Sequence, residues 1–200
     1  NEIGSLSYLF GVALIYMATG YTNIQLLSET IGQAFVSYQM NVILALALMI
    51  VGLAIKAAVF PFHIWLPDAY SQAPSTSSAI LSSIVSKVYI LVMIKVLFLV
   101  FGIDILTEMN VPIILMVFAG LAMILGSVFA IAQKDVKRML AYSSVAQMGY
   151  ILLGISLVSF LGLRAAFFHV ISHGIMKAAL FLSVGEIIFY KRTRKVNDFD

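Results

Sequence analysis

Residues 56–87 read KAAVFPFHIWLPDAYSQAPSTSSAILSSIVSK, and this stretch decides how the rest of the sequence is interpreted. Lys56 and Lys87 bound it, and each lies near the middle of an apolar helical segment long enough to cross a bilayer. An ionisable group at mid-membrane depth costs roughly 2.5 to 3.5 kcal/mol on insertion scales, so it needs a partner, water or a function. The stretch therefore predicts part of a proton path inside a membrane.

The composition supports a membrane protein and excludes several other classes. Of the 200 residues 62% are hydrophobic and 10% are charged, and the mean hydropathy of +1.05 is far above that of a soluble domain. The sequence has no cysteine, so it offers no disulfide, no thiolate metal site and no cluster ligation. It also has no GxGxxG or phosphate loop. We therefore expect no cofactor in this chain and place any redox chemistry in another subunit.

The apolar runs predict an all-α, polytopic transmembrane bundle of about six spans, forming a single domain over residues 1–200. We expect the intervening segments at residues 21–38, 68–74 and 161–162, and near Asp104 and Glu108, to be loops or turns. The expected spans cover residues 4–20, 40–66, 75–101, 111–132, 139–160 and 163–190.

The second of these spans contains a predicted helix break at Pro61 and Pro67. Pro61 lacks an N–H group and its ring collides with the carbonyl four residues back, so the helix is expected to break around residues 56–58. Broken helices occur in membranes where the freed backbone meets protein or water, which predicts a wet or protein-lined site beside Lys56. His63 lies next to the break, where it either carries protons or ties down loose backbone.

Three lysines lie near mid-depth of different predicted spans, namely Lys56, Lys87 and Lys177, which suggests a row in the membrane plane. A low-dielectric environment disfavours the charged amine, so a neighbouring charge could load or empty such a lysine. This is what a proton relay requires. A fourth lysine, Lys95, lies near a helix end and can extend its charge to the interface.

His169, His173 and Lys177 have the spacing i, i+4 and i+8, which places them on one face of the last span. Imidazole exchanges protons near neutral pH and can accept on one nitrogen while it donates from the other. The alternative is that these side chains only form hydrogen bonds that hold helices together. No metal site is expected, because two histidines without a nearby carboxylate make a weak ligand set.

Most of the excess positive charge lies in two clusters beside predicted spans, Lys134 with Lys137 and Arg138, and residues 191–195. Six crossings put both clusters and both termini on one side of the membrane. By the positive-inside rule this side is cytoplasmic, so the clusters are interpreted as orientation signals and not as a nucleic-acid surface. We expect the chain to be integral to a prokaryotic cell (inner) membrane.

Three motifs in order carry a family resemblance. They are KAAVFPFHIWLPDAYSQAP (56–74) followed by Lys87, then AQKDVKRMLAYSSVAQMGYILLG (132–154), then FFHVISHGIMKAALFLSVGEI (167–187). This series resembles the antiporter-like proton-channel subunits of respiratory complex I, of Mrp-type antiporters and of membrane-bound hydrogenases. The resemblance covers nearly the whole sequence.

The resemblance implies roles for single residues. Lys56 matches the central lysine of the family's broken helix, Lys87 matches a lysine or histidine of the next helix, and His173 and Lys177 match a later pair. It implies that protons move along these residues through water. Some members have histidine where this chain has Gln147. Family members have fourteen spans, so these six resemble the central part of that fold, either as a fragment of a longer subunit or with helices supplied by other chains.

The function implied is a proton or sodium/proton translocating membrane subunit of a redox-driven complex, similar to NADH:quinone oxidoreductase or membrane-bound hydrogenase. The chain itself would be a non-redox part of that oxidoreductase. Its expected partners are other membrane subunits, some carrying iron–sulfur or nickel–iron centres, together with lipid and protons or sodium. The alternative is an Mrp-type secondary cation/proton antiporter without redox chemistry, and a structural scaffold is the third possibility.

Overall fold

The computed structural model describes residues 2–198, and helices dominate these residues. Within residues 2–198, six helical stretches are long and apolar enough to cross a membrane, which confirms the predicted number of spans. They are Glu2–Thr19, Gln39–Ala57, Ser75–Glu108, Val111–Ile131, Val136–Ser156 and Phe160–Lys191.

The third of these stretches is built from several helical segments, while the others are single helices. The elements in chain order are α1 (Glu2–Thr19), α2 (Ile24–Ser37), α3 (Gln39–Ala57), α4 (Trp65–Gln72), α5 (Ser75–Ile80), the π-helix η1 (Leu81–Val85), α6 (Ser86–Lys95), the π-helix η2 (Val96–Phe101), α7 (Gly102–Glu108), α8 (Val111–Ile131), α9 (Val136–Ser156), α10 (Phe160–Lys191) and the 3₁₀ turn η3 (Val196–Asp198).

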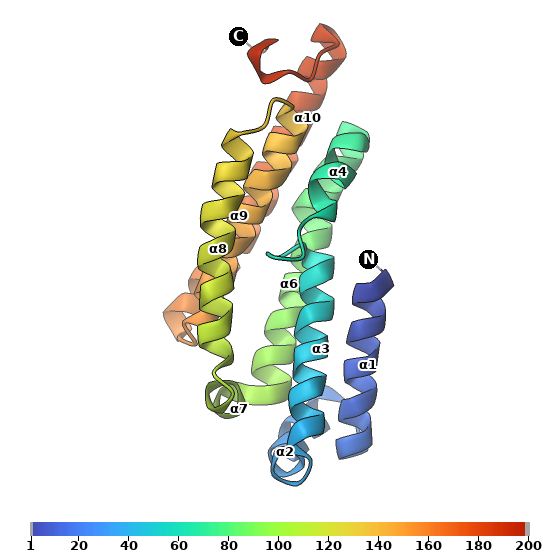
Figure 1. The fold of residues 1–200 in the computed structure, drawn as a ribbon, viewed down its shortest axis with the longest axis vertical. Coiled ribbons are helices and arrows are strands. Elements are labelled where there is room, and N and C mark those ends of the chain that lie inside the picture. The colour runs from blue at the N-terminus through green and yellow to red at the C-terminus, as the bar shows by residue number, and fades with distance from the viewer. Residues whose placement is uncertain (1, 199–200) are drawn as a thin grey trace. The chain divides into compact units, whose positions relative to one another are not determined.

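The chain divides into two compact units, and the first comprises the described residues of Asn1–Ala57 and Tyr89–Ile114. In this unit α1 runs alongside α3 (Figure 1). Their backbones approach closely at two glycines, since a Cβ built on Gly52 would lie 2.6 Å from the carbonyl oxygen of Gly4. Small residues of this kind let membrane helices pack by direct backbone contact. The short helix α2 packs against η2.

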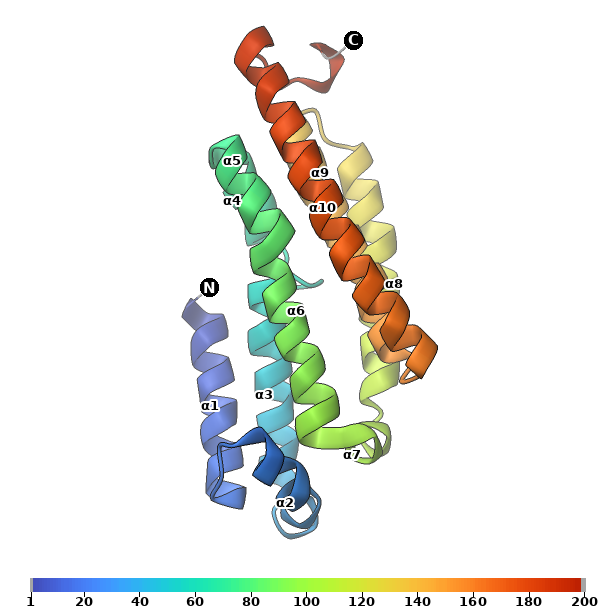
Figure 2. The ribbon, with the colours of Figure 1, turned by 180° about the vertical axis from the view of Figure 1, so that it is seen from behind.

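The second unit comprises Ala58–Val88 and the described residues of Leu115–Asp200. In this unit α9 packs against both α10 and α4, and α10 also packs against α5 and η1 (Figure 2). The core of the unit includes the rings of Tyr70 and Phe181, which meet edge to face with their centroids 5.8 Å apart. This packing holds α4, α5, α9 and α10 together around the residues described below.

The predicted helix break is confirmed at its N-terminal side, where α3 ends at Ala57 and the next helix begins at Trp65. Pro61 lies in the intervening turn. Pro67 instead lies in the first turn of α4, where its missing N–H group costs no intrahelical hydrogen bond. The predicted turn at residues 68–74 is therefore wrong for most of its length, because α4 continues to Gln72.

Two segments predicted as loops are helical. Residues 24–37 form α2, which begins after Asn23, whose side-chain oxygen accepts a hydrogen bond from the Gln25 N–H at 2.9 Å. The helix buries one face, made by Leu27, Ile31, Ala34 and Phe35. This amphipathic pattern was missed because the segment is too polar for a span. The segment with Asp104 and Glu108 likewise forms α7.

The last turn lies a few residues earlier than predicted. The α9 helix ends at Ser156, and α10 begins at Phe160 after Ser159, whose hydroxyl accepts a hydrogen bond from the Gly162 N–H at 3.1 Å. The predicted turn at residues 161–162 is therefore the first turn of α10. The hydroxyl cap satisfies a free N–H group and so outweighs the glycine as a signal for the helix start.

Candidate functional site

The second unit contains three ionisable side chains that are almost completely buried. Lys87 is 4% exposed, His173 is 0% exposed and Lys177 is 2% exposed. They lie close enough for their charges to interact with one another. The structure thus brings together three of the residues singled out in the sequence, from α6 and α10, in a part of the protein where burying a charge is costly.

Lys87 is held by the π-helical turn that precedes it. Its Nζ donates to the backbone oxygen of Ser82 and, at 3.3 Å, to the hydroxyl of Ser86. A π-turn shifts backbone hydrogen bonds from the α-helical to the i→i+5 pattern and is frequent at functional sites. This turn also packs closely against α10. A Cβ built on Gly174 of α10 would lie 3.0 Å from the backbone carbonyl oxygen of Ser83. Glycine at this position lets η1 approach α10 beside His173.

Lys177 is held by α9. Its Nζ donates to the backbone oxygen of Leu140 at 2.8 Å and to the hydroxyl of Ser143 at 2.5 Å. Gln147 lies one turn further along α9, and its Oε1 is 2.7 Å from Nε2 of His169. Residues three and four apart share a helix face, so one face of α9 contacts both ends of the His169 to Lys177 row.

The two histidines of that row stack on each other, with ring centroids 6.1 Å apart and planes inclined by 24°. His169 is half-buried and has Gln147 as its partner. His173 is fully buried, and neither of its ring nitrogens has a hydrogen-bond partner within the described residues. A buried imidazole whose two nitrogens have no hydrogen-bond partner in the described residues is available to exchange protons with the lysines beside it.

The oxygen atoms that contact the two buried amines are neutral. In the described part of the chain Lys87 and Lys177 donate to backbone carbonyls and serine hydroxyls, and to no carboxylate. Dipoles alone stabilise a buried ammonium less than a paired carboxylate does, so each amine can change its protonation state without breaking an ion pair. Residues 2–198 also contain no group of three or more His, Cys, Asp or Glu side chains placed to hold a metal ion.

Two further predicted site residues, Lys56 and His63, have aromatic neighbours. Lys56, in the first unit, is half-buried in the last turn of α3, with its Nζ 5.0 Å from the centre of the Tyr89 ring. His63, in the second unit, is 6% exposed and stacks on Phe60 at 5.2 Å between ring centroids. It also meets Tyr142 edge to face at 6.3 Å. Lys56 thus contacts one aromatic ring and His63 contacts two.

Sequence reasoning missed the serines that bind the buried amines. Nothing in the linear sequence marks Ser82, Ser86 or Ser143 as the partner of a particular lysine. The spacing of Leu140, Ser143 and Gln147 along one helix face was the signal that could have identified the α9 contacts. Gln147 was named only as a departure from histidine, whereas the structure makes it the partner of His169.

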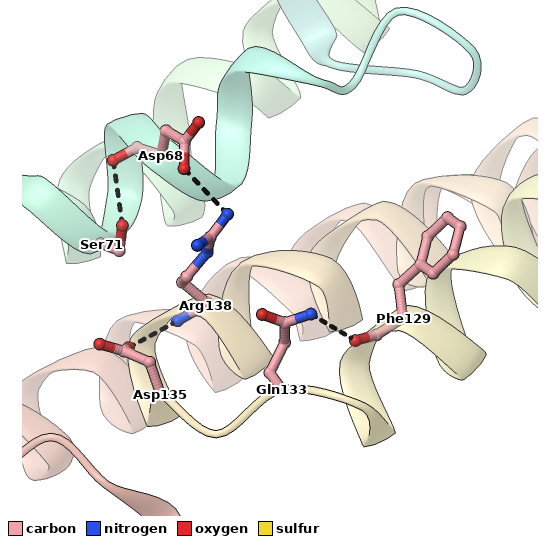
Figure 3. Close-up of polar contacts among 6 residues, drawn as sticks. All are labelled: Asp68, Ser71, Phe129, Gln133, Asp135 and Arg138. Carbon is pink, nitrogen blue, oxygen red and sulfur yellow. Dashed lines mark hydrogen bonds and ion pairs between the residues drawn. The ribbon is translucent and has the colours of Figure 1, made fainter.

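The basic clusters have local partners as well. Figure 3 shows Arg138 of α9 paired with Asp68 of α4 at 3.0 Å, and the side chain of Asp135 accepting from the Arg138 N–H. In the same view Gln133 donates to the Phe129 carbonyl at 3.0 Å, which caps the end of α8. These contacts fix the connection between α8 and α9.

The segment after α10 returns to this connection. Asp135 and Lys195 form an isolated antiparallel bridge, with Val136 N–H donating to the Arg194 oxygen at 3.0 Å and Val196 N–H donating to the Lys134 oxygen at 2.9 Å. The two basic clusters of the sequence therefore lie next to each other at one end of the second unit.

Comparisons with known proteins agree with this architecture. The sequence profile of the family described as NADH:quinone oxidoreductase/Mrp antiporter, transmembrane, matches residues 1–200. The chain is 40% identical over 197 residues to NADH-quinone oxidoreductase subunit N of Desulforudis audaxviator, covering 96% of this chain and 38% of that protein. The chain thus spans about two fifths of the length of that relative.

Solved structures of related membrane complexes show the same fold. A chain in the structure of the membrane-bound sulfane sulfur reductase, an archaeal respiratory membrane complex, superposes with a TM-score of 0.91 at 35% identity, over 100% of this chain and 40% of that one. A chain in the structure of the Mrp complex from Dietzia sp. superposes with a TM-score of 0.83 at 36% identity, over 94% of this chain and 33% of that one. The fold is therefore that of antiporter-like subunits.

Proposed function

Because this chain belongs to the NADH:quinone oxidoreductase/Mrp antiporter transmembrane family, we propose that it is a proton-translocating part of a membrane subunit in a redox-driven respiratory complex. The observation that carries this proposal is the buried cluster of Lys87, His173 and Lys177, in which no described carboxylate pairs with either amine. Ionisable groups inside a membrane bundle mark proton or ion pathways.

In the proposed mechanism a proton moves between the two buried amines by way of His173. When Lys87 is an ammonium and Lys177 is neutral, Lys87 releases a proton toward one ring nitrogen of His173, and the other nitrogen passes a proton toward Lys177. Two ammonium groups in one buried cluster repel each other, so loading one lysine favours emptying of the other. Ser82 and Ser143 hold each amine in place during the exchange.

The outer end of this row is His169, which Gln147 orients through their hydrogen bond. Gln147 has no titratable group, so it orients His169 but carries no proton of its own. Lys56 and His63 are proposed as further members of the pathway on the strength of the sequence alone. The break at Pro61 would control access of water to them.

The sidedness, the partner subunits and the transported ion are proposed from the charge distribution and from the similarity to the relatives described above. Both termini are assigned to the cytoplasmic side of a prokaryotic cell membrane, and the meeting of the two basic clusters at Asp135 and Lys195 supports one common side. The partners are other membrane subunits, and the electron-transfer centres, iron–sulfur or nickel–iron, belong to partner subunits. The transported ion is the proton, with sodium as the alternative.

A second candidate function is secondary cation/proton antiport without redox chemistry. The likeness to the Mrp complex chain favours it, since the identity of 36% equals, within one per cent, the 35% found for the respiratory complex chain. Both functions use the same buried lysines. Mass spectrometry of the intact assembly, with its iron and nickel content, separates them, because only the redox-driven complex contains subunits with metal centres.

The relay is tested by replacing each buried lysine with methionine in the full-length subunit within its native complex, reconstituted in vesicles. Lys87→Met and Lys177→Met are expected to reduce proton translocation by at least about tenfold, since each removes an essential proton carrier. Lys95→Met is the matched control, because Lys95 is an exposed lysine on the same helix as Lys87. Normal translocation by both test variants would reject the proposed function.

A further inference from the structure

The helix α4 has only eight residues, and Pro74 follows its cap residue Ala73, so its last carbonyl groups have no helical partners. Side chains from three other parts of the chain donate hydrogen bonds to these carbonyl groups. The hydroxyl of Ser78 in α5 donates to the backbone carbonyl oxygen of Tyr70 at 2.7 Å. Arg194, in the segment after α10, donates to the backbone carbonyl oxygen of Ser71 at 3.0 Å. Lys137 of α9 donates to the Ala73 oxygen.

Lys137 differs from the other members of its basic cluster in its burial. It is 1% exposed, whereas Lys134 is exposed and the Arg138 side chain is 42% exposed. A residue that served only as an orientation signal would keep its charge at the membrane surface. Instead the ammonium of Lys137 is directed at the C-terminal end of α4, where the helix dipole favours a positive charge.

The position of Lys137 along α9 connects this cap to the buried cluster. The carbonyl of Leu140, one turn further along the same helix, accepts from Lys177, and Ser143 follows within the next turn. On the other side of the contact, Ala73 leads directly into α5 and η1, which carry the carbonyl that holds Lys87. Lys137 therefore joins the segment that positions Lys87 to the helix that positions Lys177.

We propose that Lys137 is a positioning residue for proton transfer, whose ammonium caps α4 and holds the α4–α5 turn in register with α9. This proposal rests on the proposed function. Arg194 supports the same helix end through the Ser71 carbonyl. Arg138, the residue after Lys137, pairs with Asp68 of α4 (Figure 3). Loss of the cap would let α4 and the start of α5 shift, which misaligns the two lysines of the relay.

The test uses Lys137→Met, Lys137→Arg and Lys134→Met in the full-length subunit within its native complex. Proton translocation is measured per assembled complex, so that a variant that assembles poorly is not scored as a transport defect. Lys137→Met is expected to lower translocation by about tenfold, and Lys137→Arg, which keeps a charged donor, is expected to restore most of it. Lys134→Met removes the same charge from the cluster without touching α4 and is expected to transport normally.

Hydrogen–deuterium exchange of the peptide covering residues 65–78 supplies the structural measurement. Lys137→Met is expected to accelerate exchange in this peptide while leaving the peptides of α1 and α3 unchanged. Unchanged exchange in residues 65–78, or translocation equal to that of the Lys134→Met control, overturns the positioning role. Lys177→Met is measured in parallel, because normal transport by that variant would reject the relay itself, whereas a defect in Lys177→Met but not in Lys137→Met would reject only this inference.

Discussion

The ammonium of Lys177 lies 2.5 Å from the hydroxyl of Ser143, which belongs to a different helix and lies 34 residues earlier in the chain. The same ammonium donates to the Leu140 carbonyl at 2.8 Å. The amine of α10 is therefore placed by two neighbouring oxygens of α9. This relationship makes α9 a supporting helix for the proposed relay, although it contributes no titratable group to the buried cluster.

Ser143→Ala is expected to weaken the placement of Lys177. A hydrogen bond to a charged group contributes about 1.5 to 3 kcal/mol, so its loss is expected to lower proton translocation by roughly tenfold while the complex still assembles. The measurement is proton uptake by vesicles that contain the purified complex. Ser127→Ala is the control, since its exposed hydroxyl donates only to Met123 in its own helix. Equal translocation by the two variants would show that Ser143 is dispensable.

Gln147→Leu is expected to release His169 from its fixed orientation. The substitution keeps a side chain of similar size but leaves the Nε2 group without its acceptor, whereas Gln147→His retains a hydrogen-bonding partner. We expect the leucine variant to transport several-fold more slowly and the histidine variant to transport at a rate near that of the parent. Rates are compared over a range of pH. A leucine variant as fast as the histidine variant would contradict the orienting role.

Tyr89→Leu is expected to change the environment of Lys56. An ammonium over an aromatic ring gains about 0.5 to 2 kcal/mol, and Tyr89→Phe keeps the ring while it removes only the hydroxyl. The leucine variant is therefore expected to transport several-fold more slowly than the phenylalanine variant, if Lys56 carries protons as the sequence predicts. The comparison is made by the same vesicle assay. Similar rates for both variants would show that the Tyr89 ring has no effect on Lys56.

Gly149→Ala is expected to destabilise the second unit. A Cβ at this position would lie 2.9 Å from the Ala119 oxygen of α8, and such overpacking costs about 1 to 3 kcal/mol. Gly120→Ala on α8 is the matched control, because nothing lies within 4 Å of its Cβ and alanine favours a helix by up to about 1 kcal/mol. The midpoint of thermal unfolding of the purified subunit is measured for both variants. A midpoint for Gly149→Ala at or above that of Gly120→Ala would contradict the close packing of α8 and α9.

The sequence alone predicted the number of spans, the helix break before Pro61 and the burial of Lys87, His173 and Lys177. These features depend on local composition and helical spacing, which a linear pattern carries directly. The two helices that the sequence pattern does not predict, α2 and α4, also depend on local sequence. The helix α2 is amphipathic and polar, so it lacks the long apolar run that marks a span. The helix α4 contains Pro67, which is typical of a helix break but is tolerated in the first turn of a helix.

Only the tertiary structure decided what holds those side chains. Lys177 and Leu140 are separated by 37 residues, Lys137 and Ala73 by 64, and Arg194 and Ser71 by 123. Hydropathy records that a lysine lies in an apolar segment, but not which carbonyl or hydroxyl faces it. The sequence therefore identified the ionisable residues that membrane burial makes costly. The fold determined their partners, because each buried amine is bound by whichever carbonyl or hydroxyl the packing of helices brings within hydrogen-bonding distance.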